Sequence, residues 1–529
     1  MKKSTTRTGW LVCILCALTL SACAPAPTQE AGPPLVLVTL DPHATATATP
    51  FQPPAVADPP LATETAAVTE TPAPTETSTP VPPTETPENT ATPQPTAPLP
   101  TPIPASGRTQ YTMYVTLDYS NDGVAVNETV HYTNTTGQSL ANVVMAVEPN
   151  LWTNCFTLST LRQDGTDLSN YTLSGQRLTI IPAQPIDPGA VTSFTLGFSL
   201  ALPPKRSGST FGYLSDQINL TDWYPFIVPY EGKWILHDVS AYGEHLVYDA
   251  ADYDVYVSVK GSNVVLAASA PAETQGDSTH YHLEAARTFV LSASDAFQMD
   301  ESAVGSVKIH SYYFAGDENA SKGVVWMATQ SLGLYEAKFG PYPYASLSIV
   351  ETDLADGQEY DGLVFLADKF YSDYNGSAKS DLFTIGTHEI AHQWWFGLVG
   401  SDQALEPWLD EALSVYSERI YYEYNYPAYG DWWWNFRVNY FGPSGYVDSS
   451  VYDFATFRAY VNAVYLNGAN FLDDLRSRMG DQAFFAFLED YATTYAHGHA
   501  TGQDFFAMVR RHTDRDFSDI IRTYFQNQY

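Results

Sequence analysis

At 529 residues, of which 44% are hydrophobic, the chain has room for two or three domains with packed cores. Its formal net charge of −34 argues against a nucleic-acid partner, because the sequence offers no basic face to neutralise phosphates. Of its four cysteines only Cys155 lies beyond residue 23, so no internal disulfide is expected to hold the fold.

The first 23 residues are typical of an export signal. Basic residues precede a short, mostly apolar run at residues 10–20, which is too short to span a bilayer. The run ends in Leu20-Ser21-Ala22-Cys23, which resembles a bacterial lipobox, and we expect cleavage before Cys23 and a lipid on that cysteine. Ordinary cleavage beside an incidental cysteine is the alternative. The interpretation predicts an exported protein, anchored by its lipid at the bacterial cell surface or periplasmic face.

Residues 24–107 predict a disordered linker. They are mostly Pro, Thr and Ala, their charged residues are all acidic, and Phe51 is their only aromatic residue. Such a composition cannot bury enough apolar surface to become ordered. Fully extended at about 3.1 Å per residue, some 80 residues would reach on the order of 250 Å. We therefore expect a spacer between the membrane anchor and the domains that follow.

Alternating sequence predicts an all-β, sandwich-like domain over residues 108–300. Two alternating runs, 111–119 and 124–132, flank an Asn121-Asp122-Gly123 turn, which is typical of a β-hairpin. Turn residues separate the later runs, and no convincing helical pattern appears before residue 300. Further strand-like runs lie at residues 142–147, 178–181, 191–200, 253–259, 263–268 and 288–293. The segment that starts at Asp222 is expected near the junction with the next domain.

The pattern changes to α+β over residues 301–529. A strand-like run at 307–314 leads to a helical stretch at 320–339, and a second strand-like run follows at 346–351. Two further helices then carry the residues of main interest, and helical patterns continue to the end of the chain.

The strongest motif is Thr387-His388-Glu389-Ile390-Ala391-His392. Two histidines four residues apart lie on one face of a helix, so both imidazoles can reach the same point. Glu411 opens a second amphipathic helix nineteen residues beyond His392. Two histidines and a glutamate with one open position form a catalytic zinc set, and Glu389 is placed to act on a metal-bound water. The sequence therefore predicts one Zn²⁺ ion held by His388, His392 and Glu411.

These motifs resemble those of the gluzincin aminopeptidases typified by aminopeptidase N, whose zinc motif is His-Glu-x-x-His, eighteen residues, then Glu. The resemblance covers residues 109–529 and is strongest between residues 340 and 468. It implies a β-rich domain ahead of a thermolysin-like catalytic domain that ends in helices. It also implies a peptidase in which Glu389 acts as general base and then as general acid.

The resemblance implies roles for four further residues. Tyr465 lies in Val464-Tyr465-Leu466-Asn467-Gly468, similar to the family's Tyr-Glu-Lys-Gly segment, whose tyrosine stabilises the oxyanion. Glu359 falls where the family has the glutamate of Gly-x-Met-Glu-Asn, which binds the substrate's α-amine. This chain lacks that motif's methionine and asparagine, which leaves open the peptide-aligning roles of Gly357 and Gln358, and strict exopeptidase action with them.

Glu418 is a candidate supporting residue. It lies seven residues after Glu411, two helical turns along the same face, where it could accept an N–H from a ligand histidine and fix its tautomer. A solvated helix glutamate is the alternative.

We therefore predict a zinc-dependent metallopeptidase, an aminopeptidase that releases N-terminal residues from extracellular peptides. Two alternatives stay open at this point. One is an endopeptidase with altered terminal specificity, because of the changed motif around Glu359. The other is a non-catalytic peptide-binding module on the same fold, which the intact general base Glu389 argues against.

Overall fold

The described part of the chain begins with a β-hairpin. The computed structural model describes residues 107–206 and 209–529, so the predicted signal sequence, Cys23 and all but the last residue of the predicted linker lie outside the described residues. In β1 (Thr109–Asp118) and β2 (Gly123–Thr133) buried and accessible side chains alternate, as in strands with one face on a core. Asp122 adopts a left-handed φ of 49° between the two strands, which pair antiparallel as predicted.

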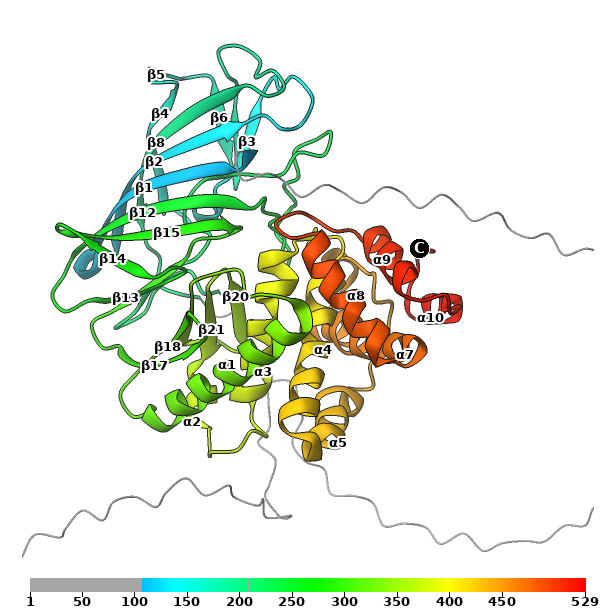
Figure 1. Cartoon of the computed structure of the whole chain (residues 1–529). Helices are drawn as coiled ribbons and strands as arrows, with labels where there is room; N and C mark the ends of the chain where they lie inside the picture. Colours follow the sequence, from blue (N-terminus) through cyan, green and yellow to red (C-terminus); the bar gives the residue numbers. More distant parts are fainter. Residues whose placement is uncertain (1–106, 207–208) are drawn as a thin grey trace, which may run out of the picture. The chain divides into compact units, whose positions relative to one another are not determined.

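Eight strands form the first sheet, in the order β14-β15-β12-β1-β2-β8-β4-β5 (Figure 1). Strands β1 and β12 run parallel, and the other neighbours in this sheet are antiparallel. Besides β1 and β2 the sheet contains β4 (Phe156–Gln163), β5 (Thr166–Asp167), β8 (Val191–Ala201), β12 (Ala251–Lys260), β14 (Ala272–Gln275) and β15 (Ser278–Ala286).

Two four-stranded sheets complete the β-rich part, which has the predicted all-β, sandwich-like character. One has the order β11-β3-β7-β6, and the Ile227 amide of β11 donates to the Tyr111 hydroxyl of β1 at 3.0 Å, which links it to the first sheet. Its strands are β3 (Val143–Ala146), β6 (Tyr171–Ser174), β7 (Arg177–Ile180) and β11 (Phe226–Ile227). The other has the order β13-β16-β10-β9, formed by β9 (Gly212–Tyr213), β10 (Ile218–Leu220), β13 (Val265–Ala268) and β16 (Leu291–Ser294).

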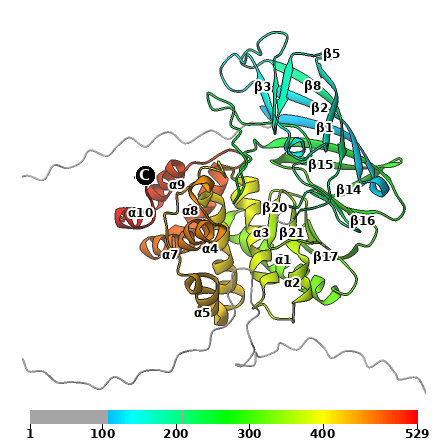
Figure 2. The same ribbon diagram turned by 180° about the vertical axis from the view of Figure 1, so that it is seen from behind.

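The part in which the sequence predicts the catalytic domain is built on a five-stranded sheet, in the order β17-β18-β19-β21-β20. Strand β17 straddles the predicted boundary between residues 300 and 301 and pairs with β18, so this sheet starts before that boundary. Strand β20 is at the edge, bonded to β21 alone, and packs beside α3 (Figure 2). The strands are β17 (Gln298–Val304), β18 (Val307–Tyr313), β19 (Ser346–Thr352), β20 (Gly357–Tyr360) and β21 (Leu363–Ala367).

Helices cover this sheet, and most of the described chain after residue 367 is helical. They are α1 (Glu318–Phe339), α2 (Asp368–Ser372), α3 (Asp381–His392), α4 (Trp408–Asn425), α5 (Gly430–Trp433), α6 (Phe457–Tyr460), α7 (Asn467–Met479), α8 (Asp481–Thr494), α9 (Gly502–His512) and α10 (Ser518–Tyr524). Three π-helical segments, Gln393–Leu398, Trp434–Val438 and Val461–Leu466, directly follow α3, α5 and α6. In the described residues no helix is both long and apolar enough to cross a membrane.

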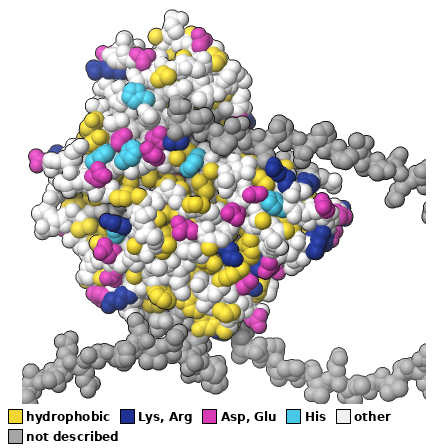
Figure 3. All heavy atoms as spheres, in the orientation of Figure 1, with side chains coloured by type: hydrophobic (Ala, Val, Ile, Leu, Met, Phe, Trp, Pro, Cys, Tyr) yellow, Lys and Arg dark blue, Asp and Glu magenta, His cyan; other side chains and the backbone are white. Residues whose placement is uncertain are grey.

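The β-rich part and the catalytic sheet are joined by buried polar contacts. Gln217 donates to the Glu351 carbonyl at 3.0 Å, and Asn219 donates to the Thr352 hydroxyl at 3.0 Å. Tyr360 reaches Asp222, which confirms the prediction that the Asp222 segment lies near the junction. On the face shown in Figure 3, basic side chains occur singly or in small groups among acidic and hydrophobic ones.

Candidate metal centre and active site

The candidate metal centre is built on α3, a helix whose last eleven residues are all buried. Its apolar residues pack on every side, and Asp381 in the first turn matches the positive end of the helix dipole. Residues four apart share a face, so His388 and His392 point together toward α4. Burial lowers the pKa of His392, which favours the neutral imidazole that a metal needs.

The three predicted ligands converge. His388 Nε2 lies 3.0 Å from His392 Nε2 and 3.2 Å from Glu411 Oε2, and His392 Nε2 lies 3.6 Å from that oxygen. Tetrahedral zinc with bonds of about 2.0–2.1 Å has donor atoms roughly 3.3 Å apart. Two imidazoles and a carboxylate at this spacing therefore fit a zinc ion with one position left open.

Carboxylates orient both ligand histidines. His388 Nδ1 lies 3.1 Å from Glu418 Oε1, the contact that the sequence suggested for this glutamate, and His392 Nδ1 lies against a carboxylate oxygen of Asp410. Such contacts select the tautomer that presents Nε2 to the metal. Sequence reasoning missed Asp410, although its position directly before Glu411 in a buried helix was an available signal.

Glu418 is held ionised by a partner from a different helix. Arg437, in the π-helical segment Trp434–Val438, donates to both Glu418 oxygens, at 2.9 and 2.7 Å. Trp433 Nε1 donates to the same carboxylate at 3.0 Å. Burial alone would raise the pKa of Glu418, but the guanidinium lowers it below its ordinary value. No sequence motif marks Arg437.

Glu389 lies beside the three ligands and against strand β20. It is 4% exposed, and within the described part of the chain its Oε2 atom has no hydrogen-bond partner. Burial, and then the nearby charge of Glu359, raise its pKa well above the ordinary value. Gly357 leaves room for it, because a Cβ atom at this position would lie 2.2 Å from Glu389 Oε1. The arrangement suits a proton acceptor that faces the open metal position.

Tyr465 is brought to the same point by the π-helical segment Val461–Leu466. Its hydroxyl donates to Glu411 Oε1 at 2.5 Å, and its ring is nearly parallel to that of His388, with centroids 6.0 Å apart. Tyr460, a buried neighbour, packs edge-on against Tyr465 at 5.4 Å. A hydroxyl beside a metal ligand is suitably placed to donate to an oxyanion.

A second carboxylate accompanies Glu359. Glu359 is 5% exposed, and its ligand-capable oxygen lies within 4.8 Å of those of Glu411 and Glu244. Gln358 bridges the pair, since its amide donates to Glu244 at 3.3 Å and to Glu359 at 2.9 Å. Carboxylates around a metal site attract a cationic group of the substrate. Gln358 thus contacts the two carboxylates, whereas Gly357 lines Glu389.

Sequence reasoning missed Glu244. It lies in the loop between β11 and β12, 114 residues before Gln358, with no motif around it. Gly243 explains how the loop reaches the site: at φ 71° it packs so closely on Tyr460 that a Cβ atom would lie 2.6 Å from the phenol oxygen. Only this long-range packing brings Glu244 to the metal centre.

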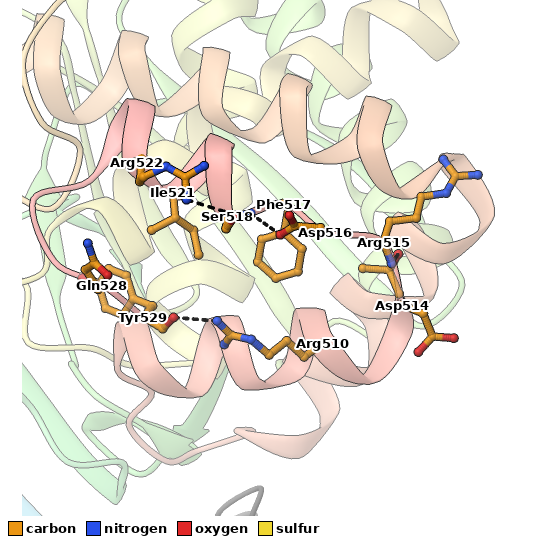
Figure 4. A pocket seen from close by; sticks show the side chains of 11 residues that line it. Arg510, Asp514, Arg515, Asp516, Phe517, Ser518, Ile521, Arg522, Gln528 and Tyr529 are labelled. Atoms are coloured by element: carbon orange, nitrogen blue, oxygen red, sulfur yellow. Dashed lines mark hydrogen bonds between the residues drawn. The ribbon is translucent and has the colours of Figure 1, made fainter. Parts of the chain in front are cut away.

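A separate surface hollow of about 280 Å³ lies between α9 and α10 (Figure 4). Its charged walls are occupied by internal contacts: Arg510 donates to the Tyr529 carbonyl at 2.6 Å, and Arg522 donates to the Ser518 hydroxyl at 3.1 Å. None of the predicted site residues lines it.

Comparison with known proteins gives a family match that includes strands β19, β20 and β21 and most of the helices. Residues 327–524 match the model of the Peptidase family M1 domain. Aminopeptidase M1-B of Oryza sativa subsp. japonica is 25% identical over 247 residues, which cover 44% of this chain and 28% of the relative. Aminopeptidase N of Lactobacillus delbrueckii subsp. lactis is 26% identical over 218 residues, which cover 37% of this chain and 26% of the relative. The matches thus span little more than a quarter of these two relatives.

Solved structures share the fold over a larger part of the chain. The M1 zinc metallopeptidase from Deinococcus radiodurans superimposes with a TM-score of 0.59 at 17% identity, covering 80% of this chain and 95% of that one. A mutant of that enzyme bound to a Tyr-Ser-Ala substrate gives a TM-score of 0.58 at 16% identity. The predicted succession of a β-rich domain and a metallopeptidase-like catalytic domain is confirmed at the level of the fold.

Proposed function

We propose that this chain is a zinc-dependent aminopeptidase of the aminopeptidase N-like gluzincin type, because residues 327–524 match the model of the Peptidase family M1 domain. The observation that carries the proposal is the meeting of two carboxylates, Glu359 and Glu244, beside the candidate zinc ligands. They supply a place for a free ammonium group next to the metal. The Tyr-Ser-Ala peptide bound by the Deinococcus enzyme supports short peptides as substrates.

The proposed chemistry assigns a role to each side chain. Zinc bound by His388, His392 and Glu411 would supply Lewis acidity, lowering the pKa of a water and polarising the scissile carbonyl. Glu389 takes the proton from the attacking water and delivers it to the leaving amine. The Tyr465 hydroxyl, already within reach of the ligand shell, donates to the developing oxyanion.

Strand β20 and the paired carboxylates determine which bond is cut. An extended peptide can add to the free edge of β20, the edge strand that packs beside α3. With its ammonium group between Glu359 and Glu244, its first carbonyl would come close to the candidate zinc ligands and to Glu389. A blocked N-terminus cannot make this contact, so the geometry favours free N-termini.

Soluble protein from residue 108 onward tests the proposal. Chromogenic aminoacyl amides and matched N-acetylated peptides are assayed with and without chelator, with Glu389→Gln as the inactive control. Chelator-sensitive release from free-amine substrates alone is the expected result. Cleavage of the blocked peptides would favour an endopeptidase, and bound zinc without turnover of either substrate would favour a peptide-binding module.

We also propose that the chain is exported and lipid-anchored through Cys23, which places its substrates outside the bacterial cell. The support is the Leu20-Ser21-Ala22-Cys23 motif alone. Expression of the full chain and of Cys23→Ser in a bacterial host with labelled palmitate tests it. Label and membrane association in the parent chain but not in the variant are expected; equal behaviour of the two would contradict the proposal.

A further inference from the structure

The two carboxylates proposed to bind the substrate amine come from different parts of the chain. Glu359 lies on β20 of the catalytic sheet, whereas Glu244 lies in a loop of the β-rich part. To bind one ammonium group, an oxygen of each carboxylate must lie within hydrogen-bond distance of the same nitrogen. The separation of the two carboxylates therefore has to be set before the substrate binds. Their shared donor, Gln358, is itself a flexible side chain on an edge strand.

Near each carboxylate in the sequence is a tyrosine whose hydroxyl donates a hydrogen bond to the same residue, Asp222. Tyr360 follows Glu359, and because side chains alternate along a strand it points away from the metal site into the β-rich part. Its hydroxyl donates to Asp222 Oδ2 at 3.4 Å. Tyr248, four residues after Glu244, donates to Asp222 Oδ1 at 2.6 Å. One carboxylate therefore anchors both of the segments that carry the amine-binding groups.

Asp222 is itself held in place. Its φ of 49° is left-handed, a conformation in which Asp and Asn are the non-glycine residues most often found. The next residue, Trp223, is fully buried, and its indole donates to the Phe289 carbonyl at 3.0 Å. The Thr210 hydroxyl forms a second hydrogen bond with the phenol of Tyr360, with the two oxygens 3.3 Å apart. Both ends of the contact between Asp222 and Tyr360 are thus held by further contacts within the β-rich part.

We propose that Asp222 is a positioning residue for substrate recognition: by anchoring Tyr360 and Tyr248 it sets the separation of Glu359 and Glu244, and through them the binding of the α-ammonium group. This inference rests on the proposed aminopeptidase function. It adds to that function a residue of the β-rich part that touches neither the metal ligands nor the substrate.

The test compares two ligands that differ only in the amine. Leucine hydroxamate and N-acetyl-leucine hydroxamate both carry a metal-binding group, and only the first carries a free ammonium. Asp222→Asn keeps a residue that tolerates the left-handed backbone but removes one carboxylate oxygen. We expect the preference for the free-amine ligand, measured as the ratio of inhibition constants, to fall about 10-fold, because a small misplacement at a binding site has a large effect.

Kinetics and further variants sharpen the test. For a free-amine substrate, Asp222→Asn and Tyr360→Phe are each expected to raise KM about 10-fold with little change in kcat. The double variant is expected to be no worse than Asp222→Asn alone, because Tyr360→Phe removes a contact that Asp222→Asn already disturbs. Tyr416→Phe is the matched control. It also removes a hydrogen bond from a tyrosine hydroxyl to an aspartate, the one from Tyr416 to Asp473 at 2.9 Å, which joins α4 to α7.

The outcomes separate this inference from the proposed function. If the unmodified protein does not prefer the free-amine hydroxamate, the aminopeptidase assignment is wrong. If it does and Asp222→Asn retains the full preference, the positioning role is wrong while the assignment stands. Equal weakening of both hydroxamates would show that Asp222 only maintains the structure, and would also overturn the inference.

Discussion

At the scale of single residues, the site depends on the absence of a side chain at Gly357. A Cβ atom there would lie 2.2 Å from Glu389 Oε1, so Gly357→Ala must push the proposed base aside. Misplacement of this size is expected to lower kcat about 100-fold without loss of zinc. Kinetics with metal analysis of the purified variant is the measurement.

Gly333→Ala is the control for that change. In α1 a Cβ atom on Gly333 would meet nothing closer than Val304 Cγ1, at 4.0 Å. It should leave kcat within about twofold, since alanine suits a helix interior better than glycine. A Gly357→Ala variant as active as this control would show that Glu389 has freedom to move that the packing does not suggest.

Glu418 is the residue through which the protein is expected to tune its metal affinity. It contacts His388 Nδ1 at 3.1 Å, and its carboxylate accepts two hydrogen bonds from Arg437. Glu418→Gln removes the negative charge that makes the imidazole a better ligand. We expect it to weaken zinc affinity about 10–100-fold, as is usual when a residue that orients a ligand histidine is replaced. Competition with a chromophoric zinc chelator measures the effect; an unchanged zinc affinity would mean that the Glu418 contact is only structural.

At the scale of elements, strand β19 carries a buried acid that makes stability depend on pH. Glu351 is 2% exposed, and burial raises its pKa from 4.5 to about 8. The folded chain therefore holds a proton that the unfolded chain releases between about pH 4.5 and 8, and the free energy of unfolding falls as pH rises through this window. Glu351→Gln, which stays neutral, should match the parent near pH 5 and exceed its Tm at pH 9 by about 2 °C or more.

Thermal melts from pH 5 to 9 measure this effect, with Glu301→Gln as control. Glu301 is exposed on β17, so its replacement should leave the pH profile of Tm parallel to that of the parent. A Glu351→Gln profile that is also parallel would contradict the assignment of the pH dependence to this strand.

The elements also show what a sequence can and cannot reveal. His388 and His392 were predictable because four-residue spacing alone places two side chains on one helix face. Strands β9 and β11, two residues each, are too short to display alternation. Glu244 was invisible for another reason: its place in the site is set by packing against Tyr460, more than 200 residues along the chain, and no local pattern encodes such contacts.

At the scale of the whole molecule, Arg287 ties the β-rich part to the metal-bearing helices. It is 2% exposed, and its guanidinium donates to the carbonyls of Tyr248, Phe396 and Gly498, at 2.8, 2.7 and 2.5 Å. These carbonyls belong to the β-rich part, to the π-helical segment after α3 and to the loop after α8. Asp361, after β20, accepts from the Arg287 amide at 3.0 Å and lies close to the same charge.

Arg287→Met should therefore weaken the molecule far more than an ordinary arginine substitution. It leaves buried carbonyls without donors and takes a compensating charge from Asp361, a loss worth about 3–5 kcal/mol. Arg162→Met breaks an exposed pair with Asp167, at 2.7 Å, and should cost less than about 1 kcal/mol. Urea unfolding followed by tryptophan fluorescence compares the two midpoints. Equal shifts would mean that the junction is held by apolar packing and that the buried guanidinium contributes little beyond its volume.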